Sequence, residues 1–294
     1  EKILEDAVES KRLKTVSEYT KLETDYDVSF ICVGTPIQTN GEMSLNQLIQ
    51  VTNSIGQYIN RNPNYHLVVI RSTVTPGTSR NILLPILQKV TDNKFGEKFG
   101  IASNPEFLRE TTAVSDFLNP QYTIIGGLDT KSSNTLSNLY SKLKGPKHIL
   151  TTDESEMLKL SSNAFHALKV GFANEIGRYS EKLSIDSHKV MEIFMEDKKL
   201  NISKSYLKPG FAFGGSCLPK DLQSLTTQSK NSGVSLPILE GTLASNNLHI
   251  EHAASKILSY NPNSIGILGL GFKPKSDDVR ESPSVRLIQK LMNH

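Results

Sequence analysis

The residues best suited to chemistry lie in the segment 209–221, whose sequence is PGFAFGGSCLPKD. Its glycines permit backbone conformations that other residues avoid, and they let a ligand approach the main chain closely. Pro219 suits the first turn of a helix, so Cys217 is expected at or beside a helix N-terminus. There the helix dipole and the free N–H groups favour the thiolate over the thiol.

Two charged neighbours of this cysteine point the same way. Lys220 follows at about one helical turn and would lower the pKa of the Cys217 thiol further. Asp221, four residues after Cys217, falls on the same helical face and can orient water or take a proton. The segment therefore predicts an activated nucleophile. The plainer alternative is a glycine-rich loop that caps a helix over an inert cysteine.

A second group of polar residues recurs along one side of a predicted long helix. Lys159 and Asn163 are four residues apart, and His166 and Asn174 continue roughly along the same side. A lysine and amides aimed at one place can hold an oxyanion or a sugar hydroxyl. The alternative is a solvated polar stripe.

Three further segments follow predicted strands. Val33–Pro36 and Arg71–Val74 come directly after apolar runs, and Asn104–Glu110 follows the run Gly100–Ser103. Ligands of α/β folds bind outside the carboxyl ends of the strands, so these segments should line one edge of a sheet. Glu110 is a candidate base or water-orienting group, or alternatively a carboxylate at the start of a helix.

The elements that must position these residues alternate in the first part of the chain. Short β-branched and aromatic runs are typical of buried parallel strands, and helix-like segments separate them, so we expect a parallel sheet covered on both faces. The expected strands are Val28–Val33, Leu67–Ile70, Gly100–Ser103 and Tyr122–Ile125, and the expected helices are Leu45–Asn60, Ser79–Val90 and Ser132–Leu143.

The pattern changes near Thr151 and again near Ser264. Between these points the sequence predicts helices, led by one long helix over Asp153–Leu183 that is N-capped from the Thr152–Asp153 region. A short apolar strand over Ile265–Leu270 and a helix that begins near Pro283 then open a new β–turn–α unit. The remaining expected helices are Ser187–Glu196, Leu218–Ser229, Ile238–Leu258 and Ser282–Asn293.

The composition of the chain argues against several functional classes. The 294 residues carry 33 Lys+Arg against 30 Asp+Glu, a net charge of +3, so a strongly basic nucleic-acid binder is not expected. No apolar run is long enough to span a bilayer. Two cysteines exclude a disulfide framework and a cysteine-rich metal site. Cys32 lies in an apolar run and is expected to be a small core residue. We expect a cytoplasmic protein.

These segments, in this order, resemble the family of NAD-dependent nucleotide-sugar 6-dehydrogenases, the UDP-glucose and GDP-mannose dehydrogenases. The most specific match is Gly210–Asp221, and the resemblance covers nearly the whole chain. The GDP-mannose branch is the more similar, although Lys208 stands where that branch typically carries Arg, and Lys lacks the bidentate fork. The other matching stretches are Phe30–Pro36, Arg71–Val74, Asn104–Glu110, Lys159 with Asn163, His166–Gly177, Lys199–Asn201, Gly269–Lys273 and Asp277–Pro283.

The resemblance implies oxidation of a primary alcohol at C6 of the sugar to a carboxylate with two NAD. Cys217 would form a thiohemiacetal and then a thioester, which water hydrolyses. Lys159 and Asn163 would stabilise the oxyanion. Asp221, Thr73 and Glu110 would handle water and protons.

The resemblance also implies binding residues. NAD would contact Thr35, Thr73, Lys220 and Arg280. The nucleotide sugar would contact Phe107, Leu108, Glu110, Lys159, Asn163, His166, Asn174, Tyr206, Lys208, Phe211, Phe213, Gly214 and Lys273. No metal is implied. The partners expected are a nucleotide-sugar substrate and a second copy of the chain through the long helix, with neither a nucleic acid nor a membrane.

In fold class we therefore expect an α/β protein with a truncated Rossmann-like parallel-sheet domain over 1–150. A helical central domain with the cysteine loop would occupy 151–262, and the start of a second Rossmann-like domain would occupy 263–294. No G-x-G-x-x-G turn precedes Val28, so weak NAD binding and poor turnover are expected of this chain alone. The alternatives are a UDP-sugar 6-dehydrogenase, a non-catalytic nucleotide-sugar-binding or oligomerisation module, and a cysteine hydrolase or transferase that works without NAD.

Overall fold

The computed structural model describes the chain except for residues 1, 17–24, 37, 39–41, 110–111, 203–210, 216–217, 220–221, 223–225, 228–229, 231–232, 273–276 and 294, and the side chains at 2, 164, 166, 167, 170, 171, 174 and 178. The chain divides into two compact units, Glu1–Ala164 and Phe165–His294. Each unit has hydrophobic clusters of its own. The expected division into three domains stays a prediction.

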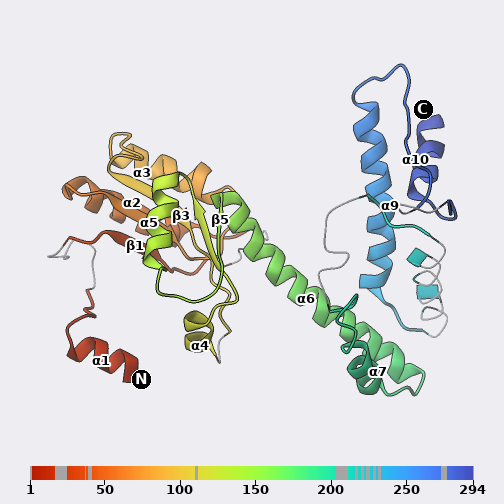
Figure 1. Ribbon diagram of the computed structural model, residues 1–294, viewed down its shortest axis with the longest axis horizontal. Helices are drawn as coiled ribbons and strands as arrows, with labels where there is room; N and C mark the ends of the chain where they lie inside the picture. The colour runs from red at the N-terminus through yellow and green to blue at the C-terminus, as the bar shows by residue number, and fades with distance from the viewer. Residues whose placement is uncertain are drawn as a thin grey trace. The chain divides into compact units, whose positions relative to one another are not determined.

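The first unit is built on a β-sheet with helices packed beside it (Figure 1). The sheet has five strands in the order β1-β2-β3-β4-β5. The strands are β1 (Val28–Ile31), β2 (His66–Ile70), β3 (Phe99–Ser103), β4 (Thr123–Gly127) and β5 (Lys147–Leu150). All neighbouring pairs are parallel except β3 and β4, which are antiparallel.

The antiparallel pair corrects the expectation of a wholly parallel sheet. A parallel neighbour needs a crossover connection, usually a helix packed on the sheet. The connection from β3 to β4 contains only α4 (Ala113–Leu118), a six-residue helix with no buried residue. It does not act as a crossover helix, and the chain turns back along β3. The prediction of an α/β fold with a Rossmann-type, mostly parallel sheet is confirmed.

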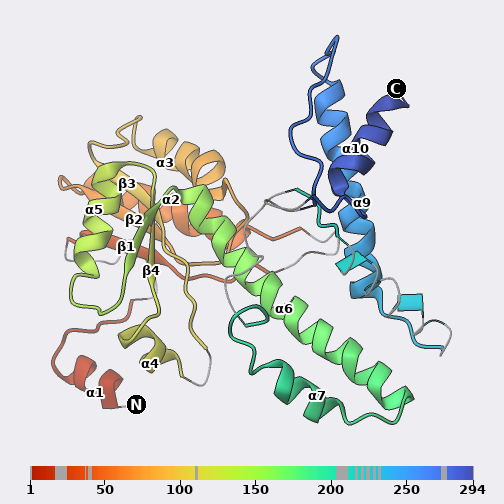
Figure 2. The same ribbon diagram turned by 45° about the vertical axis from the view of Figure 1, so that its right-hand side comes forward.

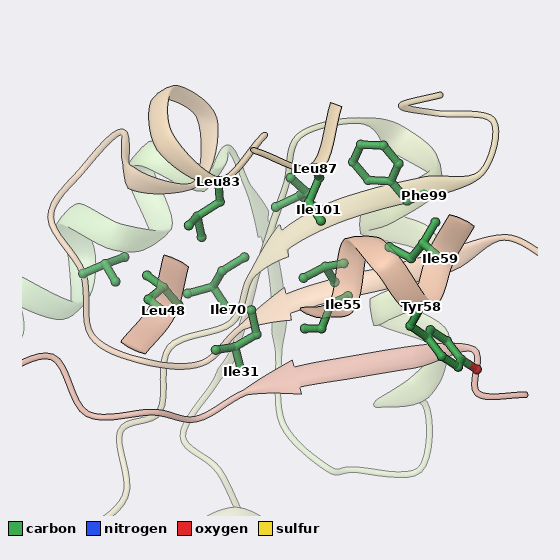
Figure 3. Close-up of a cluster of buried hydrophobic side chains, with 12 residues drawn as sticks. Ile31, Leu48, Ile55, Tyr58, Ile59, Ile70, Leu83, Leu87, Phe99 and Ile101 are labelled. Carbon is green, nitrogen blue, oxygen red and sulfur yellow. The ribbon is translucent and has the colours of Figure 1, made fainter. Parts of the chain in front are cut away.

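Helices cover both faces of this sheet (Figure 2). On one face α2 (Asn46–Arg61) and α3 (Leu84–Val90) bury Ile55 and Leu87 against Ile70 and Ile101 (Figure 3). On the other face α5 (Thr130–Leu139) buries Leu136. Strand β2 is buried along its whole length because its alternate side chains serve the two clusters. Its apolar run therefore shows no alternation in the sequence.

The predicted helices of the first unit form with small shifts at their ends. The segment predicted as one helix over Ser79–Val90 is a π-helical turn, η2 (Ser79–Leu83), followed by α3. Pro85 lies in the first turn of α3 and has no N–H to continue an α-helical ladder. The first six residues of the sequence are expected to be helical, and they form most of α1 (Lys2–Glu9). The structure adds two elements that the sequence did not predict, α4 and β5.

The long helix is confirmed as α6 (Thr152–Lys182). The helices α7 (Ser187–Phe194), α9 (Pro237–Leu258) and α10 (Pro283–Met292) also agree with the predicted segments. Most of the predicted helix over 218–229 lies outside the described residues. In the described part of the chain no helix has the length and apolar character needed to cross a bilayer.

The second unit lacks the strand predicted over Ile265–Leu270. These residues adopt no regular structure, and Leu268 is fully exposed. Among the described residues of this unit there is no other strand to pair with them, so their N–H and C=O groups gain nothing from an extended ladder. The apolar composition predicted a strand, but the described chain provides no neighbour for it.

Candidate functional site

The loops after β1 and β2 are bonded to each other at the carboxyl edge of the sheet. The Thr35 hydroxyl donates to the carbonyl oxygen of Thr73 at 2.7 Å, and the Ser72 hydroxyl donates to that of Val33 at 2.6 Å. Because β1 and β2 are parallel and adjacent, their ends bring Thr35 and Thr73 together. The predicted convergence of these loops is therefore present in the structure.

A buried amide ties the loop after β3 to the same edge. Asn104 is buried, and its Oδ1 accepts from Arg71 Nη1 at 2.6 Å and from the Tyr140 hydroxyl at 2.6 Å. Its Nδ2 donates to the carbonyl oxygen of Ile124 at 2.7 Å. Since Arg71 follows β2 and Tyr140 directly follows α5, this one side chain fixes the start of the segment 104–110.

Lys159 of α6 contacts the same segment at Glu106. Its Nζ donates to the carbonyl oxygen of Glu106 at 2.5 Å and lies 3.1 Å from Glu106 Oε1. The ammonium also lies 5.2 Å from the centre of the Phe107 ring, a cation–π distance. Lys159 is buried, so a charged donor is held in a fixed position beside the sheet edge.

Glu106 is the functional candidate that the sequence analysis missed. Burial raises the pKa of this carboxyl, but the N–H of Leu108 at 2.6 Å and the bond from Lys159 outweigh that effect, so the pKa lies below its ordinary value. Its carboxylate can accept a proton or orient a polar group. The signal was present, because Glu106 and Glu110 stand in one motif, yet only the second was singled out.

The other predicted residues of this group are only partly placed. Asn163, one turn beyond Lys159 on α6, is exposed. Leu108 and Phe107 are half-buried. His166 and Asn174 belong to α6, but their side chains are outside the described set. Glu110, Tyr206, Lys208, Cys217, Lys220, Asp221 and Lys273 also lie outside the described residues, so their predicted roles stay predictions.

The expected position of Cys32 is wrong. It was expected in the core, but it is exposed just beyond the end of β1. Side chains alternate along a strand, and while Ile31 points into the cluster under α2, Phe30 and Cys32 are exposed. Partial burial still raises the pKa of the Cys32 thiol, with the Arg71 charge opposing.

A second acidic residue anchors α6 to the loop that contains Thr73. Glu156 is buried, and its carboxylate accepts from the N–H groups of Gly77 at 2.7 Å and Ser79 at 3.0 Å. It therefore satisfies free N–H groups where η2 begins. Burial raises the pKa of Glu156, and the backbone hydrogen bonds oppose this only in part.

In the second unit, the described part of the cysteine segment packs on the start of α10. A Cβ at Gly214 would meet the carbonyl oxygen of Glu281 and, at 2.6 Å, Pro283 Cδ. Only glycine fits this approach. Phe213 directly precedes Gly214. Arg280 directly precedes Glu281, and its guanidinium donates to both carboxylate oxygens of Asp278, at 3.0 and 2.7 Å. Gly214, a predicted sugar-binding residue, thus contacts the residue that follows Arg280, a predicted cofactor-binding residue.

A third predicted sugar-binding residue, Phe211, contacts α9. Its ring lies 6.1 Å from that of His249, centre to centre. The side chain remains exposed despite this contact, so part of the ring stays accessible to a ligand.

The residues at the sheet edge fit a dinucleotide. The carboxyl ends of parallel strands are the usual site for such ligands, and Thr35 and Thr73 place hydroxyl and carbonyl groups there. A methyl group at Gly34 would meet only Gln47 Oε1, at 3.9 Å, among the described residues.

Comparisons with known proteins support the same interpretation. Residues 1–144 match the model of the UDP-glucose/GDP-mannose dehydrogenase family, NAD binding domain, and residues 153–248 match its central domain. GDP-mannose 6-dehydrogenase of Pseudomonas aeruginosa is 41% identical over 292 residues, which are 99% of this chain and 67% of that protein. UDP-glucose 6-dehydrogenase of Rickettsia prowazekii is 35% identical over 298 residues, or 99% and 66%.

Solved structures agree. A ternary complex of GDP-mannose dehydrogenase from P. aeruginosa matches with a TM-score of 0.96 at 41% identity, over 99% of this chain and 66% of that one. A UDP-glucose dehydrogenase from Pyrobaculum islandicum matches with a TM-score of 0.64 at 34% identity, over 99% and 67%. The chain spans about two thirds of the length of these relatives. The predicted family and its cofactor, NAD, are confirmed: the chain belongs to the UDP-glucose/GDP-mannose dehydrogenase family of NAD-dependent oxidoreductases.

Proposed function

We propose that this chain carries the catalytic core of a nucleotide-sugar 6-dehydrogenase that oxidises C6 of GDP-mannose to the carboxylate. The observation that carries the proposal is the fixed, buried ammonium of Lys159 beside the sheet edge. A charged donor held in a low-dielectric position stabilises a developing oxyanion without reorganisation. The choice of GDP-mannose is supported by the names of relatives at 38–41% identity, against 35% for the UDP-glucose enzymes.

The reaction divides into two oxidations and one hydrolysis. When bound, NAD accepts a hydride in each oxidation. In the first, the C6 hydroxyl loses its proton to a base of the chain, for which Glu106 and Glu110 are candidates, and becomes an aldehyde. The Cys217 thiolate then adds to the aldehyde carbon and forms a thiohemiacetal. Loss of the second hydride leaves a thioester on Cys217, and attack by water releases the carboxylate and restores the thiol.

The chain's own side chains would stabilise the negative charge that develops on the substrate and would orient the attacking water. Oxygen at C6 carries negative charge in the thiohemiacetal and in the tetrahedral intermediate of hydrolysis, and Lys159 and Asn163 are proposed to donate to it. Asp221, Thr73 and Glu110 are proposed to orient water and carry protons. Thr35, Thr73, Lys220 and Arg280 are proposed to hold the cofactor. The nucleotide sugar would lie against Phe211, Phe213 and Gly214, with Tyr206, Lys208 and Lys273 also in contact.

The long helix would also serve assembly. Phe165 and Leu168 of α6 are exposed large apolar residues, which supports the proposed homodimer through this helix. Light scattering after size exclusion would give the mass in solution, and a monomer at micromolar concentration would contradict this part of the proposal.

The test expresses the gene with its natural ends and follows NADH in the presence of GDP-mannose or UDP-glucose. We expect two NADH for each sugar consumed, a higher kcat/KM with GDP-mannose, and loss of turnover in Cys217→Ser. Cys32→Ser is the matched control, because it removes the only other thiol, and it should keep the wild-type rate. Full activity of Cys217→Ser would contradict the mechanism. Faster turnover of UDP-glucose would favour the alternative, a UDP-sugar 6-dehydrogenase.

A further inference from the structure

One side chain of α9 is hydrogen-bonded to the main chain of the cysteine segment. Asn246 Oδ1 accepts from the N–H of Phe213 at 2.9 Å, and Asn246 Nδ2 donates to the carbonyl oxygen of the same residue at 3.0 Å. The amide thus pairs with both backbone groups of one residue, as a neighbouring strand would do. Phe213 stands four residues before Cys217 in the sequence.

The support behind Asn246 is rigid. The residue is buried in the middle of α9, with Ile250 and Ala254 one and two turns further along the same helix in a buried cluster. The N-terminus of α9 is held by Glu175 of α6, which is buried and accepts from the N–H groups of Ile238 at 2.8 Å and Leu239 at 3.4 Å. Because α9 is held in this way, the Asn246 side chain has a fixed position and restricts the motion of the loop that it binds.

The main chain of the cysteine segment also has close contacts that do not involve Asn246. Gly214 lies against Glu281 and Pro283, and Gly215 has a φ of +89° with Phe272 close to it. Between these contacts and Asn246, the main chain at 213–215 has two opposed supports. Removal of the Asn246 bonds would free one side, because no other described side chain is shown to hold the Phe213 backbone.

We propose that Asn246 is a positioning residue that sets the backbone of the cysteine loop through Phe213. The inference rests on the proposed role of Cys217 as nucleophile. Asn246 is buried and satisfies the N–H and C=O of half-buried Phe213, so it is costly to replace. The two bonds need one donor and one acceptor on the same side chain. Alanine removes both bonds, while an aspartate removes the donor and sets its charge against the Phe213 carbonyl oxygen.

The test compares Asn246→Ala and Asn246→Asp with a matched control on the full chain. Asn247→Asp makes the same change one residue along α9, where the side chain accepts from Arg286 at 2.8 Å and is exposed. Two quantities are measured: steady-state turnover with GDP-mannose and NAD, and the rate of Cys217 alkylation as a function of pH, read by peptide mass spectrometry. Cys32 is an internal reference in the same molecules and belongs to the other unit.

We expect kcat to fall about ten- to hundredfold in both Asn246 variants, because a small misplacement of a reacting group is enough to do this. The KM for NAD should change by less than about twofold. The alkylation profile of Cys217 should move towards the ordinary thiol pKa of about 8.5, while that of Cys32 stays in place. Asn247→Asp should match the wild type in all of these.

The outcomes separate the two proposals. An inactive Cys217→Ser together with a fully active Asn246→Ala would overturn the role of Asn246 alone. A fully active Cys217→Ser would overturn both. A cooperative thermal transition like that of the wild type confirms that a variant is folded, and an unchanged Cys32 profile shows that the first unit is undisturbed. If Asn246→Asp does not fold, Asn246→Ala decides, and an unshifted Cys217 profile in it overturns the inference.

Discussion

The carboxylate of Glu106 lies 3.1 Å from the ammonium of Lys159, which also donates to the Glu106 carbonyl oxygen at 2.5 Å. One residue of the loop after β3 thus binds α6 through its main chain and its side chain together. The lysine is therefore fixed before any substrate arrives, and little side-chain entropy remains to be lost at the moment of reaction.

Lys159→Met should abolish most turnover and leave the fold intact. Methionine keeps much of the length and apolar character of the lysine stem but removes the charged donor, and loss of one such donor costs on the order of 10²–10³ in kcat. Lys169→Met is the matched control, because Lys169 is exposed on the same helix with its ammonium 4.9 Å from the Phe165 ring. Equal rates in the two variants would contradict the proposed role of Lys159.

Glu106→Gln should remove an acid-dependent part of the stability. The pKa of Glu106 lies below its ordinary value of 4.5, since the hydrogen bonds to its carboxylate outweigh its burial. The stabilisation is therefore complete above pH 4.5 and is lost as the pH falls through the lowered pKa. Urea unfolding at neutral pH and at a series of acidic pH values should show a shallower acid loss in the variant.

Glu97→Gln makes the same change at an exposed residue of the same unit. It should reproduce the wild-type pH dependence. An identical acid slope in wild type and Glu106→Gln would mean that the Lys159 pair stabilises the two protonation states equally.

The fold could be predicted where an element carries a local pattern of its own. Strand β2 shows a continuous apolar run and helix α6 a long helical repeat, so each follows from composition and period. Strand β5 could not be predicted, because none of its four side chains is buried and its sequence carries no long apolar run. The direction of β4 depends on how the chain returns after β3, which no local pattern records.

The site could be predicted as a set of segments but not as a set of contacts. Parallel strands bring their carboxyl ends to one edge, so the meeting of Thr35 with Thr73 follows from the strand pattern alone. The choice of Glu106 as partner of Lys159 spans 53 residues and depends on the path of one loop. Cys32 was placed wrongly because an apolar run does not say which face of its strand is covered.

Glu156→Gln should change how the free energy of unfolding depends on pH above pH 4.5. Burial raises the pKa of Glu156 above 4.5, so its contribution is complete below pH 4.5 and is lost as the pH rises through the raised value. A glutamine has no such titration, and it leaves one of the N–H groups of Gly77 and Ser79 without an acceptor, at about 1–3 kcal/mol. The free-energy difference between wild type and variant should therefore narrow as the pH rises.

That difference can be measured by urea unfolding at a series of pH values from mildly acidic to mildly alkaline. Glu181→Gln, an exposed change on the same helix, should leave the curve unmoved. A difference between the wild type and the Glu156→Gln variant that stays constant with pH would contradict the raised pKa.

Gly126→Ala should destabilise the first unit by overpacking the contact between β4 and α6. A Cβ at Gly126 would lie 2.5 Å from Ser155 Cβ and 2.9 Å from the carbonyl oxygen of Thr151. Neither neighbour is the end of a flexible side chain, so backbone must shift, at about 1–3 kcal/mol. Gly241→Ala is the opposite case: a Cβ there meets nothing within 4 Å among the described residues around helix α9. That change should stabilise by about 0.5–1 kcal/mol. Equal unfolding free energies for the two variants would contradict the close approach of β4 to α6.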